Sequence, residues 1–350
     1  MRWRLNGLGD SRMMAAVWLG KENLVVRDVE RPSAGPGEAL IRVRWAGICG
    51  TDLAVYAGKF PRARPPLIPG HEFSGEIVQV PRENPSGLKE GDAVVADPLL
   101  PCGACYSCRM GMYNVCENFA IMGVDASGSF AEFVKVKAGN IYLLPPHLSL
   151  ELAALTEPTA VALHTVQRSG MRLGDSVVIL GGGPIGLLIA ELARMGGALP
   201  IIISEASSYR AGLARKLGFE VVVPDKDQLE KRVRELTRGR GADVVFDAVG
   251  LPAVASEFTR ISRIGGRIAV VGIYKEQAPV DLREVCFNEL TIIGSRVYRY
   301  PDFEKVMDLI LNDSDRLSSI ITEKMELDQI GRGMKLLNEG RAMKVLIHPS

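Results

Sequence analysis

The chain has 350 residues, of which 47% are hydrophobic and 24% charged, the balance of an ordinary globular protein with length for two domains. Its formal net charge of +1 gives no electrostatic reason to expect a nucleic acid or an anionic membrane as partner. No apolar run could span a bilayer, and the first residues lack the apolar core of a secretory signal, so we expect a cytoplasmic protein with reduced thiols.

Residues 1–13 are expected to form an N-terminal extension without structure of its own. The region that follows contains short β-like runs separated by clusters of Gly and Pro. This punctuation predicts an antiparallel, barrel-like region. The predicted strands occupy residues 14–19, 38–48, 74–80, 92–100 and 130–139.

The pattern changes near residue 150, where residues 151–170 have the apolar periodicity of a helix. Strands and helices then alternate, which predicts a doubly wound parallel sheet. Its strands are expected at 176–180, 200–204, 220–223, 243–250, 267–273 and 290–295, and its helices at 184–196, 208–218, 228–239 and 252–262. Residues 300–350 return to a mixed α and β pattern that could rejoin the first region.

The first turn of the parallel unit has the sequence GGGPIG, at residues 181–186. It follows an apolar strand and opens a helix, which is the context in which G-x-G-x-x-G indicates a dinucleotide site. Gly181 permits the tight turn, Gly183 lets a pyrophosphate approach and Gly186 permits close packing of helix on strand. Pro184 and Ile185 complete the turn at the helix N-terminus, whose free N–H groups favour phosphate.

The next strand ends at Glu205, 19 residues after Gly186, where an acidic residue is expected to bind the ribose hydroxyls. A carboxylate there repels a 2′-phosphate, which favours NAD over NADP. Arg210 weakens this preference, because a nearby arginine can accept the phosphate. We also expect Val271 and Ile273, at the end of a later strand, to contact the cofactor.

Four cysteines, Cys102, Cys105, Cys108 and Cys116, lie within fifteen residues with the spacing C-x2-C-x2-C-x7-C. Short loops of this kind allow four thiolates to converge on one zinc ion. A bacterial iron–sulfur motif has a shorter last gap followed by Pro, and a disulfide pair needs an oxidising compartment. A redox Cys-x-x-Cys usually opens a helix, whereas this segment is a Gly-rich loop. We therefore predict a closed structural zinc site.

A second set of possible ligands is dispersed along the chain. A catalytic zinc usually has three protein ligands and one open position. Cys49 and His71 supply two, and Glu157 supplies the third unless Glu72 replaces it or exchanges with it. Of the other histidines, His164 is equally consistent with a packed helix residue. Cys286 lies outside both groups and is expected to be a buried small residue.

In this combination the chain resembles the zinc-dependent medium-chain alcohol and polyol dehydrogenases. The resemblance covers residues 14–347 and includes CGTD at 49–52, GHEFSG at 70–75, the four cysteines, Glu157-Pro158 and GGGPIG, in that order. It implies an α/β protein with a GroES-like β-rich catalytic domain, residues 14–164 and 299–350, and a Rossmann NAD-binding domain, residues 165–298. The active site would lie in the cleft between them.

The resemblance assigns roles to individual residues. Cys49, His71 and Glu157 match the catalytic zinc ligands. Glu72 matches an acid that either lies behind the ligands or exchanges with one of them. Asp52 matches the residue that orients the histidine, and Thr51 the hydroxyl that takes the alcohol's proton. With a glutamate at position 157 the chain resembles the sorbitol and butanediol dehydrogenases more than the ethanol-type enzymes, which have a cysteine at that position. Many relatives pass the proton to a His at the position of Ala54, so the exit route differs here. Candidate substrate contacts are Tyr56, Phe60, Phe119, Arg296 and Tyr298.

The resemblance implies a zinc-dependent oxidoreductase that transfers hydride from a polyol, sugar or related secondary alcohol to NAD and yields a ketone. It implies two zinc ions per chain and a homo-oligomer, either a tetramer or a dimer. One alternative is L-threonine 3-dehydrogenase, against which Ala54 counts modestly. An alternative from another class is a non-catalytic module that binds zinc and NAD, which the joint presence of Cys49, Thr51, His71 and Glu157 disfavours.

Overall fold

The computed structural model describes residues 11–81, 84, 87–224 and 226–349. Residues 1–10 of the predicted extension lie outside the described residues. Arg12 and Met13 instead belong to the first strand, β1 (Arg12–Gly20), so the predicted end of the extension at residue 13 is wrong. The strand begins early because Arg12 forms an ion pair of 2.8 Å with Asp28 on the next strand, and because Met13 is buried.

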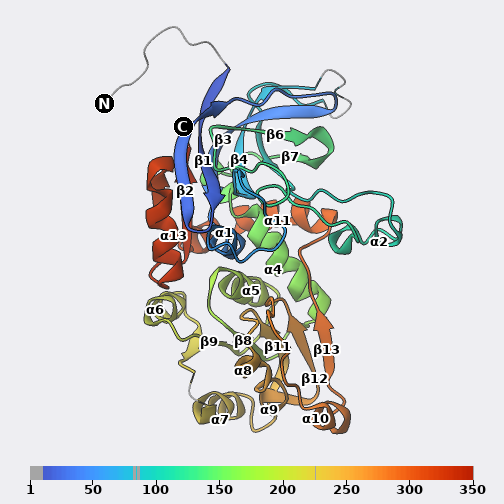
Figure 1. Ribbon diagram of the computed structural model, residues 1–350. Coiled ribbons are helices and arrows are strands. Elements are labelled where there is room, and N and C mark those ends of the chain that lie inside the picture. The colour runs from blue at the N-terminus through green and yellow to red at the C-terminus, as the bar shows by residue number, and fades with distance from the viewer. Residues whose placement is uncertain (1–10, 82–83, 85–86, 225, 350) are drawn as a thin grey trace.

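The β-rich part contains a two-stranded and a seven-stranded sheet (Figure 1). Strand β1 pairs with β2 (Asn23–Glu30), which was not predicted because its apolar residues do not alternate regularly with polar ones. The larger sheet has the order β14-β15-β3-β4-β5-β7, with β6 paired to β3. Its strands are β3 (Glu38–Gly47), β4 (Glu72–Gln79), β5 (Ala93–Ala96), β6 (Phe133–Lys137), β7 (Ile141–Leu143), β14 (Ile321–Glu326) and β15 (Lys344–His348). The C-terminal region therefore rejoins the first region, as expected.

The register of the central strands brings distant segments to one point. Gly47, at the end of β3, lies opposite Glu72 at the start of β4, and opposite Leu346 on β15. Because β3 and β4 are antiparallel, the residues just after β3 and just before β4 meet at the same edge. A side chain at position 47 would collide with Glu72, since an added Cβ would lie 2.2 Å from Oε2.

The second part is a six-stranded parallel sheet of order β10-β9-β8-β11-β12-β13 (Figure 1). Numbered from its first strand this is 3-2-1-4-5-6, the order of a Rossmann dinucleotide-binding fold. The strands are β8 (Val177–Leu180), β9 (Ile201–Ser204), β10 (Glu220–Val222), β11 (Ala242–Asp247), β12 (Ser262–Val270) and β13 (Thr291–Gly294). The strand order reverses between β8 and β11, where such folds bind their ligands.

Helices pack in both parts of the protein and at the junction between them. They are α1 (Gly50–Tyr56), α2 (Tyr106–Arg109), α3 (Leu150–Ala153), α4 (Thr156–Ser169), α5 (Pro184–Met195), α6 (Ser208–Lys216), α7 (Lys226–Leu236), α8 (Pro252–Ala255), α9 (Phe258–Ile261), α10 (Leu282–Phe287), α11 (Tyr300–Asn312), α12 (Ser314–Ser318) and α13 (Ile330–Asn338). Short 3-10 turns lie at Tyr113–Val115, Ala138–Asn140 and Leu327–Gln329. The helix predicted over 151–170 is divided into α3 and α4. Pro158 explains this, because proline lacks an N–H and is tolerated only in a first turn.

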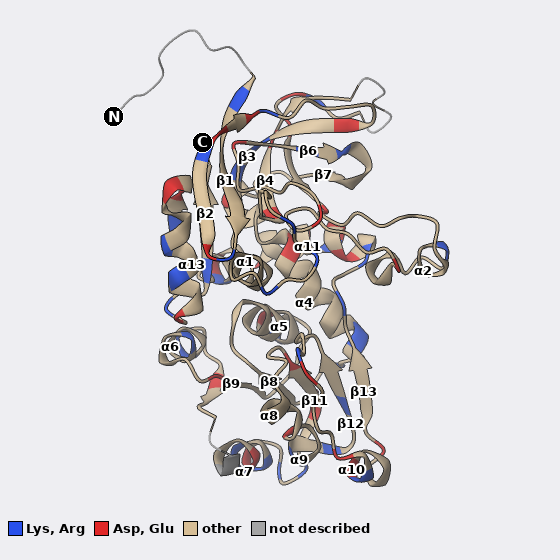
Figure 2. Cartoon of the chain, viewed as in Figure 1, with Lys and Arg blue, Asp and Glu red and all other residues tan. Residues whose placement is uncertain are grey.

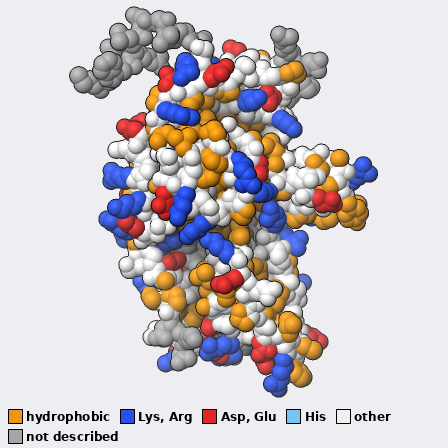
Figure 3. Space-filling model, in the orientation of Figure 1, with side chains coloured by type: hydrophobic (Ala, Val, Ile, Leu, Met, Phe, Trp, Pro, Cys, Tyr) orange, Lys and Arg blue, Asp and Glu red, His pale blue; other side chains and the backbone are white. Residues whose placement is uncertain are grey.

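Helices α4, α5 and α11 form the junction between the two parts (Figure 1). His164 of α4 is buried, and its Nδ1 lies 2.9 Å from a carboxylate oxygen of Asp302 on α11, so it is a packed, partnered histidine. The predicted domain limits fall within α4 and between β13 and α11. Acidic and basic residues are interspersed over both parts (Figure 2), and basic side chains recur across the waist of the face in Figure 3. No described helix is long and apolar enough to cross a membrane.

Candidate active site and metal centres

Three of the predicted ligands converge at the edge where β3 ends and β4 begins. One donor atom each of Cys49, His71 and Glu72 lie within 4.8 Å of one another, and all three belong to the group that the register of β3 and β4 assembles. Cys49 is the N-cap of α1, and His71 directly precedes β4. Gly70 is required before His71, since it has φ +98° and an added Cβ would lie 2.7 Å from Ser129 Oγ.

Asp52 fixes the backbone on both sides of this group. Its carboxylate accepts hydrogen bonds from the N–H of Cys49, at 2.8 Å, and from the N–H of Gly70, at 3.2 Å. The same carboxylate lies 3.7 Å from His71 Nδ1, which is buried without a hydrogen-bond partner among the described residues. A carboxylate beside Nδ1 favours the tautomer that leaves Nε2 free as a metal ligand. The orienting role of Asp52 stays a prediction, since 3.7 Å is longer than a hydrogen bond.

Glu157 opens α4 and lies outside the 4.8 Å group. The Glu157 carboxyl is nevertheless close enough for the charges of that group to change its pKa. Burial raises the pKa of Glu157 well above its ordinary value, His71 opposes this, and the charges of Glu72 and Cys49 raise it further. The predicted third ligand is thus an electrostatic neighbour of the other ligands.

Lys344 is the residue of this site that sequence reasoning missed. Its Nζ lies 2.6 and 2.9 Å from the two carboxylate oxygens of Glu72 and donates to the carbonyl of Ile48 at 3.2 Å. Lys344 and Glu72 are 2% and 1% exposed, so they form a fully buried ion pair. A lone lysine inside the apolar run AMKVLI was the available signal, since lysine is seldom buried unpaired.

The donor set fits a divalent cation. Thiol, imidazole and carboxylate groups are the usual ligands of zinc. Burial raises the pKa of Cys49 to about 12, Glu72 and Asp52 add to this, and Lys344 opposes it. Several acidic groups are therefore buried around one lysine. A metal ion would supply the missing positive charge and release the thiol proton.

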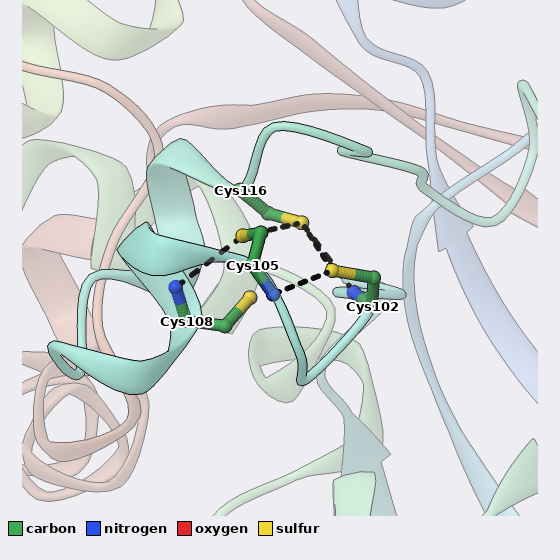
Figure 4. A group of neighbouring side chains, drawn as sticks. All are labelled: Cys102, Cys105, Cys108 and Cys116. Atoms are coloured by element: carbon green, nitrogen blue, oxygen red, sulfur yellow. Dashed lines mark hydrogen bonds between the residues drawn. The ribbon is translucent and has the colours of Figure 1, made fainter.

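The four cysteines of the predicted structural site also converge (Figure 4). Their sulfur atoms lie within 4.8 Å of one another, with Cys116 Sγ 3.5 Å from Cys102 Sγ and 3.8 Å from Cys105 Sγ. Four sulfurs bound tetrahedrally to zinc at about 2.3 Å would be about 3.8 Å apart. The cluster therefore has nearly the dimensions of a zinc tetrathiolate.

Backbone N–H groups point at these sulfurs. Cys105 N donates to Cys102 Sγ at 3.4 Å, and Cys108 N donates to Cys105 Sγ at 3.5 Å. Such bonds from Ala104 and Cys105 lower the pKa of Cys102 to about 6. Burial and the neighbouring thiols raise the pKa of Cys108 to about 12. Neighbouring thiolates repel one another, which opposes the loss of another thiol proton, and a bound cation reduces this repulsion. The site thus fits a structural metal.

A cavity of about 570 Å³ lies at the carboxyl ends of β8, β9 and β11, where the strand order reverses. Gly181, Gly183, Glu205 and Arg210 line it. The N-terminus of α5 opens beside it at Gly183 with no side-chain cap, which leaves N–H groups for a pyrophosphate. Gly186 permits the close turn, because an added Cβ would lie 1.8 Å from the carbonyl oxygen of Gly181.

Glu205 and Arg210 have defined partners in this cavity. The Glu205 carboxylate accepts the N–H of Gly182 at 2.7 Å and the N–H of Ser207 at 2.6 Å. Arg210 donates to the carbonyls of Leu337, at 3.2 Å, and Ala342, at 3.5 Å. Four other predicted cofactor contacts are not among the residues that line this cavity. Pro184 and Ile185 open α5, and Val271 and Ile273 follow β12.

The predicted substrate contacts have different environments. Phe60, Phe119 and Arg296 are brought together, and the ring of Phe119 lies under the guanidinium of Arg296. Tyr56 ends α1, is partly buried, and its carbonyl accepts the Trp18 indole N–H at 3.4 Å. Tyr298 has no exposed surface, and its hydroxyl donates to Asp97 at 3.0 Å. This position in the core differs from the substrate contact predicted for Tyr298, because the hydrogen bond to buried Asp97 holds the hydroxyl inside the protein.

Two further residues correct or extend the sequence analysis. Cys286 lies on α10 and is exposed, so the expectation of a buried residue is wrong; no residue of α10 is buried, and Val285 is partly buried against the core. Arg62, from a Pro-rich loop, contacts both Phe60 and Phe119 and was not predicted. No local signal singles out an arginine among several in that loop.

Comparison with known proteins gives two matches to protein-family models. The alcohol dehydrogenase GroES-like domain matches residues 35–146, and the zinc-binding dehydrogenase domain matches residues 184–312. An L-threonine 3-dehydrogenase of Caldanaerobacter subterraneus subsp. tengcongensis is 36% identical, over 94% of this chain and 96% of that protein. A 2-dehydro-3-deoxy-L-galactonate 5-dehydrogenase of Pseudoalteromonas atlantica is 37% identical, over 96% of this chain and 98% of that protein.

Solved structures agree. The 2R,3R-butanediol dehydrogenase of Bacillus subtilis superposes with a TM-score of 0.89 at 33% identity, over 97% of this chain and 100% of that chain. These findings confirm the predicted combination of a GroES-like domain with a Rossmann-type domain. The chain belongs to the zinc-type medium-chain alcohol dehydrogenases, a family of oxidoreductases that use NAD(P).

Proposed function

We propose that this protein oxidises a polyol, a sugar or a related secondary alcohol to a ketone and transfers the hydride to NAD. The observation that carries the proposal is the convergence of Cys49, His71 and Glu72 within 4.8 Å, with Glu157 as their electrostatic neighbour. A dinucleotide-type turn with an uncapped helix accompanies this group in the same chain. Metal-ligand and dinucleotide sites together are what alcohol oxidation by hydride transfer needs.

We assign the first metal site to Cys49, His71 and Glu157, with Glu72 as a carboxylate that can exchange with Glu157. When bound, a zinc ion supplies a Lewis acid for the alcohol oxygen, and a nicotinamide supplies the hydride acceptor. Thr51, two residues after Cys49, accepts the alcohol proton at its hydroxyl. Asp52 holds the Cys49 and Gly70 N–H groups and orients His71. The route by which the proton leaves Thr51 differs from relatives with His at the position of Ala54.

We assign a second, structural zinc to Cys102, Cys105, Cys108 and Cys116. The sulfur spacing supports this, and four thiolates leave no open position for a substrate. The protein as isolated should therefore contain two zinc ions per chain by elemental analysis. A content of one would remove either the structural or the catalytic assignment.

We propose NAD rather than NADP as the cofactor. The Glu205 carboxylate lines the cavity and would repel a 2′-phosphate. Two nitrogens of the Arg210 guanidinium already donate to the carbonyls of Leu337 and Ala342, which reduces the capacity of Arg210 to bind that phosphate. A Glu205→Ala variant should raise KM for NAD at least tenfold and change KM for NADP less. Equal use of both cofactors by the unaltered protein would contradict the preference.

A second candidate function is L-threonine 3-dehydrogenase, since a relative of that name is 36% identical over nearly the whole chain. A panel of polyols, aldoses, inositols, diols and threonine, assayed with NAD and NADP, separates the two. Oxidation of threonine alone favours the second function. Unchanged NAD reduction by Cys49→Ser with every alcohol would refute the proposed zinc chemistry and favour a non-catalytic module.

We also propose that the protein is a cytoplasmic homo-oligomer. The reduced cysteine cluster suits a reducing compartment. Strand β13 is one edge of the parallel sheet, and its Ile292 is exposed, as are Leu282 and Phe287 on α10, which precedes it. An exposed edge strand with apolar residues favours pairing with another copy. Light scattering should give a dimer or a tetramer, and Ile292→Lys should shift the mass towards the monomer.

A further inference from the structure

Two arginines share one aromatic ring near the junction of the two parts. The guanidinium carbon of Arg296 lies 4.5 Å from the centre of the Phe119 ring, and that of Arg62 lies 5.6 Å from the same centre. Arg62 also donates to the carbonyl of Phe119 and lies 5.7 Å from the ring of Phe60. Three segments distant in sequence thus form one cluster: the loop after α1, the loop after the four cysteines, and the link from β13 to α11.

The charges of this cluster do not balance. Arg62 forms an ion pair with Asp125, with Nη2 3.2 Å from Oδ2. Among the described residues no carboxylate is found against the guanidinium of Arg296. Burial and the charge of Arg62 lower the pKa of Arg296, and no acidic group opposes them. Two guanidiniums and one carboxylate leave one positive charge without a partner.

The link that carries Arg296 runs beside the candidate catalytic site. Asn114 Nδ2 donates to the carbonyl of Arg296 at 3.0 Å, which fixes the backbone at that position. Tyr298, two residues later, belongs to the same apolar cluster as Val55 on α1 and Leu155 at the start of α4, and Phe60 and Phe119 pack against that cluster. Helix α1 begins after Cys49, and Glu157 lies in the first turn of α4. The cluster therefore connects Arg296 with the helices that begin beside the candidate metal ligands, in the segment joining the two parts, where ligand sites are common.

We propose that Arg296, supported by Arg62, binds a carboxylate of the substrate, so that the alcohol oxidised is a hydroxy acid and not a neutral polyol. This inference rests on the proposed function and specifies its substrate class. The planar guanidinium of arginine donates two parallel hydrogen bonds to a carboxylate. The single unbalanced charge matches a carboxylate monoanion better than a phosphate ester, which carries nearly two charges. Phe119 holds both guanidiniums in place by their contact with its ring.

The test compares acids with amides of the same shape. Each acid is assayed with NAD beside its primary amide, which retains the hydroxyl groups but lacks the negative charge. The acids are gluconate, galactonate, threonate and threonine. For the best pair, kcat/KM should be about tenfold to a hundredfold higher for the acid, the range expected for charge-assisted hydrogen bonds. Arg296→Leu should bring this ratio close to one, and Arg62→Leu should lower it by a smaller factor.

Arg64→Leu is the matched control. Arg64 lies in the same loop as Arg62, but within the described part of the chain its guanidinium donates to the carbonyls of Pro61 and Ala63 and to no other group. This variant should keep the acid-to-amide ratio of the unaltered protein. The inference is overturned if amides or neutral polyols are oxidised as well as the acids, or if Arg296→Leu lowers acid and amide equally. A neutral best substrate refutes this inference and leaves the proposed function standing, whereas no oxidation of any alcohol rejects both.

Discussion

Replacement of Lys344 by methionine removes the cation of a fully buried ion pair without a large change in volume. Both partners are at most 2% exposed, and Glu72 has both carboxylate oxygens within 2.9 Å of the lysine nitrogen. Removing one partner of a buried pair leaves an uncompensated charge and typically costs about 3–5 kcal/mol. Lys344→Met also leaves the Ile48 carbonyl without its donor. We therefore expect the upper part of that range, about 5 kcal/mol.

The assay is urea unfolding in the presence of a metal chelator, so that a metal ion cannot neutralise the freed Glu72. Tryptophan fluorescence is a suitable signal, because Trp45 lies on β3, the neighbour of β15. The double variant Glu72→Gln/Lys344→Met should lose less stability than Lys344→Met alone, since it leaves no unpaired charge.

Lys335→Met is the matched control for this experiment. Lys335 lies 3.9 Å from Glu339 on the surface of α13, and its side chain is 75% exposed. Exposed pairs of this kind contribute about 0–1 kcal/mol. The reasoning is wrong if Lys344→Met and Lys335→Met have the same stability, or if the double variant is less stable than Lys344→Met.

Burial raises the pKa of Asp97 to about 6, so its ionisation in the folded protein should cost about 3 kcal/mol above pH 6 and nothing below pH 4. The free energy of unfolding of Asp97→Asn should therefore increase by about 3 kcal/mol relative to that of the unaltered protein as the pH rises from 4 to 8. Urea unfolding that changes with pH equally in both proteins would contradict this. Gly186→Ala should weaken NADH binding at least tenfold in a nicotinamide fluorescence titration, because the new Cβ would lie 1.8 Å from the Gly181 carbonyl; unchanged affinity would exclude that turn as the phosphate site. Cys116→Ser should lower the zinc content by one ion per chain, whereas Cys286→Ser, an exposed cysteine outside both clusters, should leave it unchanged.

Local spacing accounts for the parts of the site that were predictable. The four cysteines fall within fifteen residues, so short loops alone bring their sulfurs together. The phosphate-binding turn is likewise a property of six adjacent residues. Cys49 and His71 are farther apart, but each stands in a short motif, and antiparallel pairing of β3 with β4 brings them to one edge.

Long-range contacts account for what was missed. Lys344 is 272 residues from Glu72 in sequence, and only the pairing of β15 with β3 makes them neighbours. Arg62 and Arg296 meet over Phe119 through three unrelated loops. Tyr298 was expected at the substrate, but its hydroxyl partner, Asp97, lies 201 residues away. No periodicity carries such information, because periodicity reports only which face of its own element a residue occupies.

Residue type and spacing within one element or loop were sufficient to predict the fold class and the alternation of the parallel unit. They also identified the Gly-rich turn and the two groups of candidate metal ligands. Tertiary contacts determine which charges are buried together: Glu72 is paired with Lys344, and among the residues that the structure describes no carboxylate opposes the charge of Arg296. Strand register and the meeting of distant loops determine those neighbours, and burial then makes each unbalanced charge costly enough to specify a ligand.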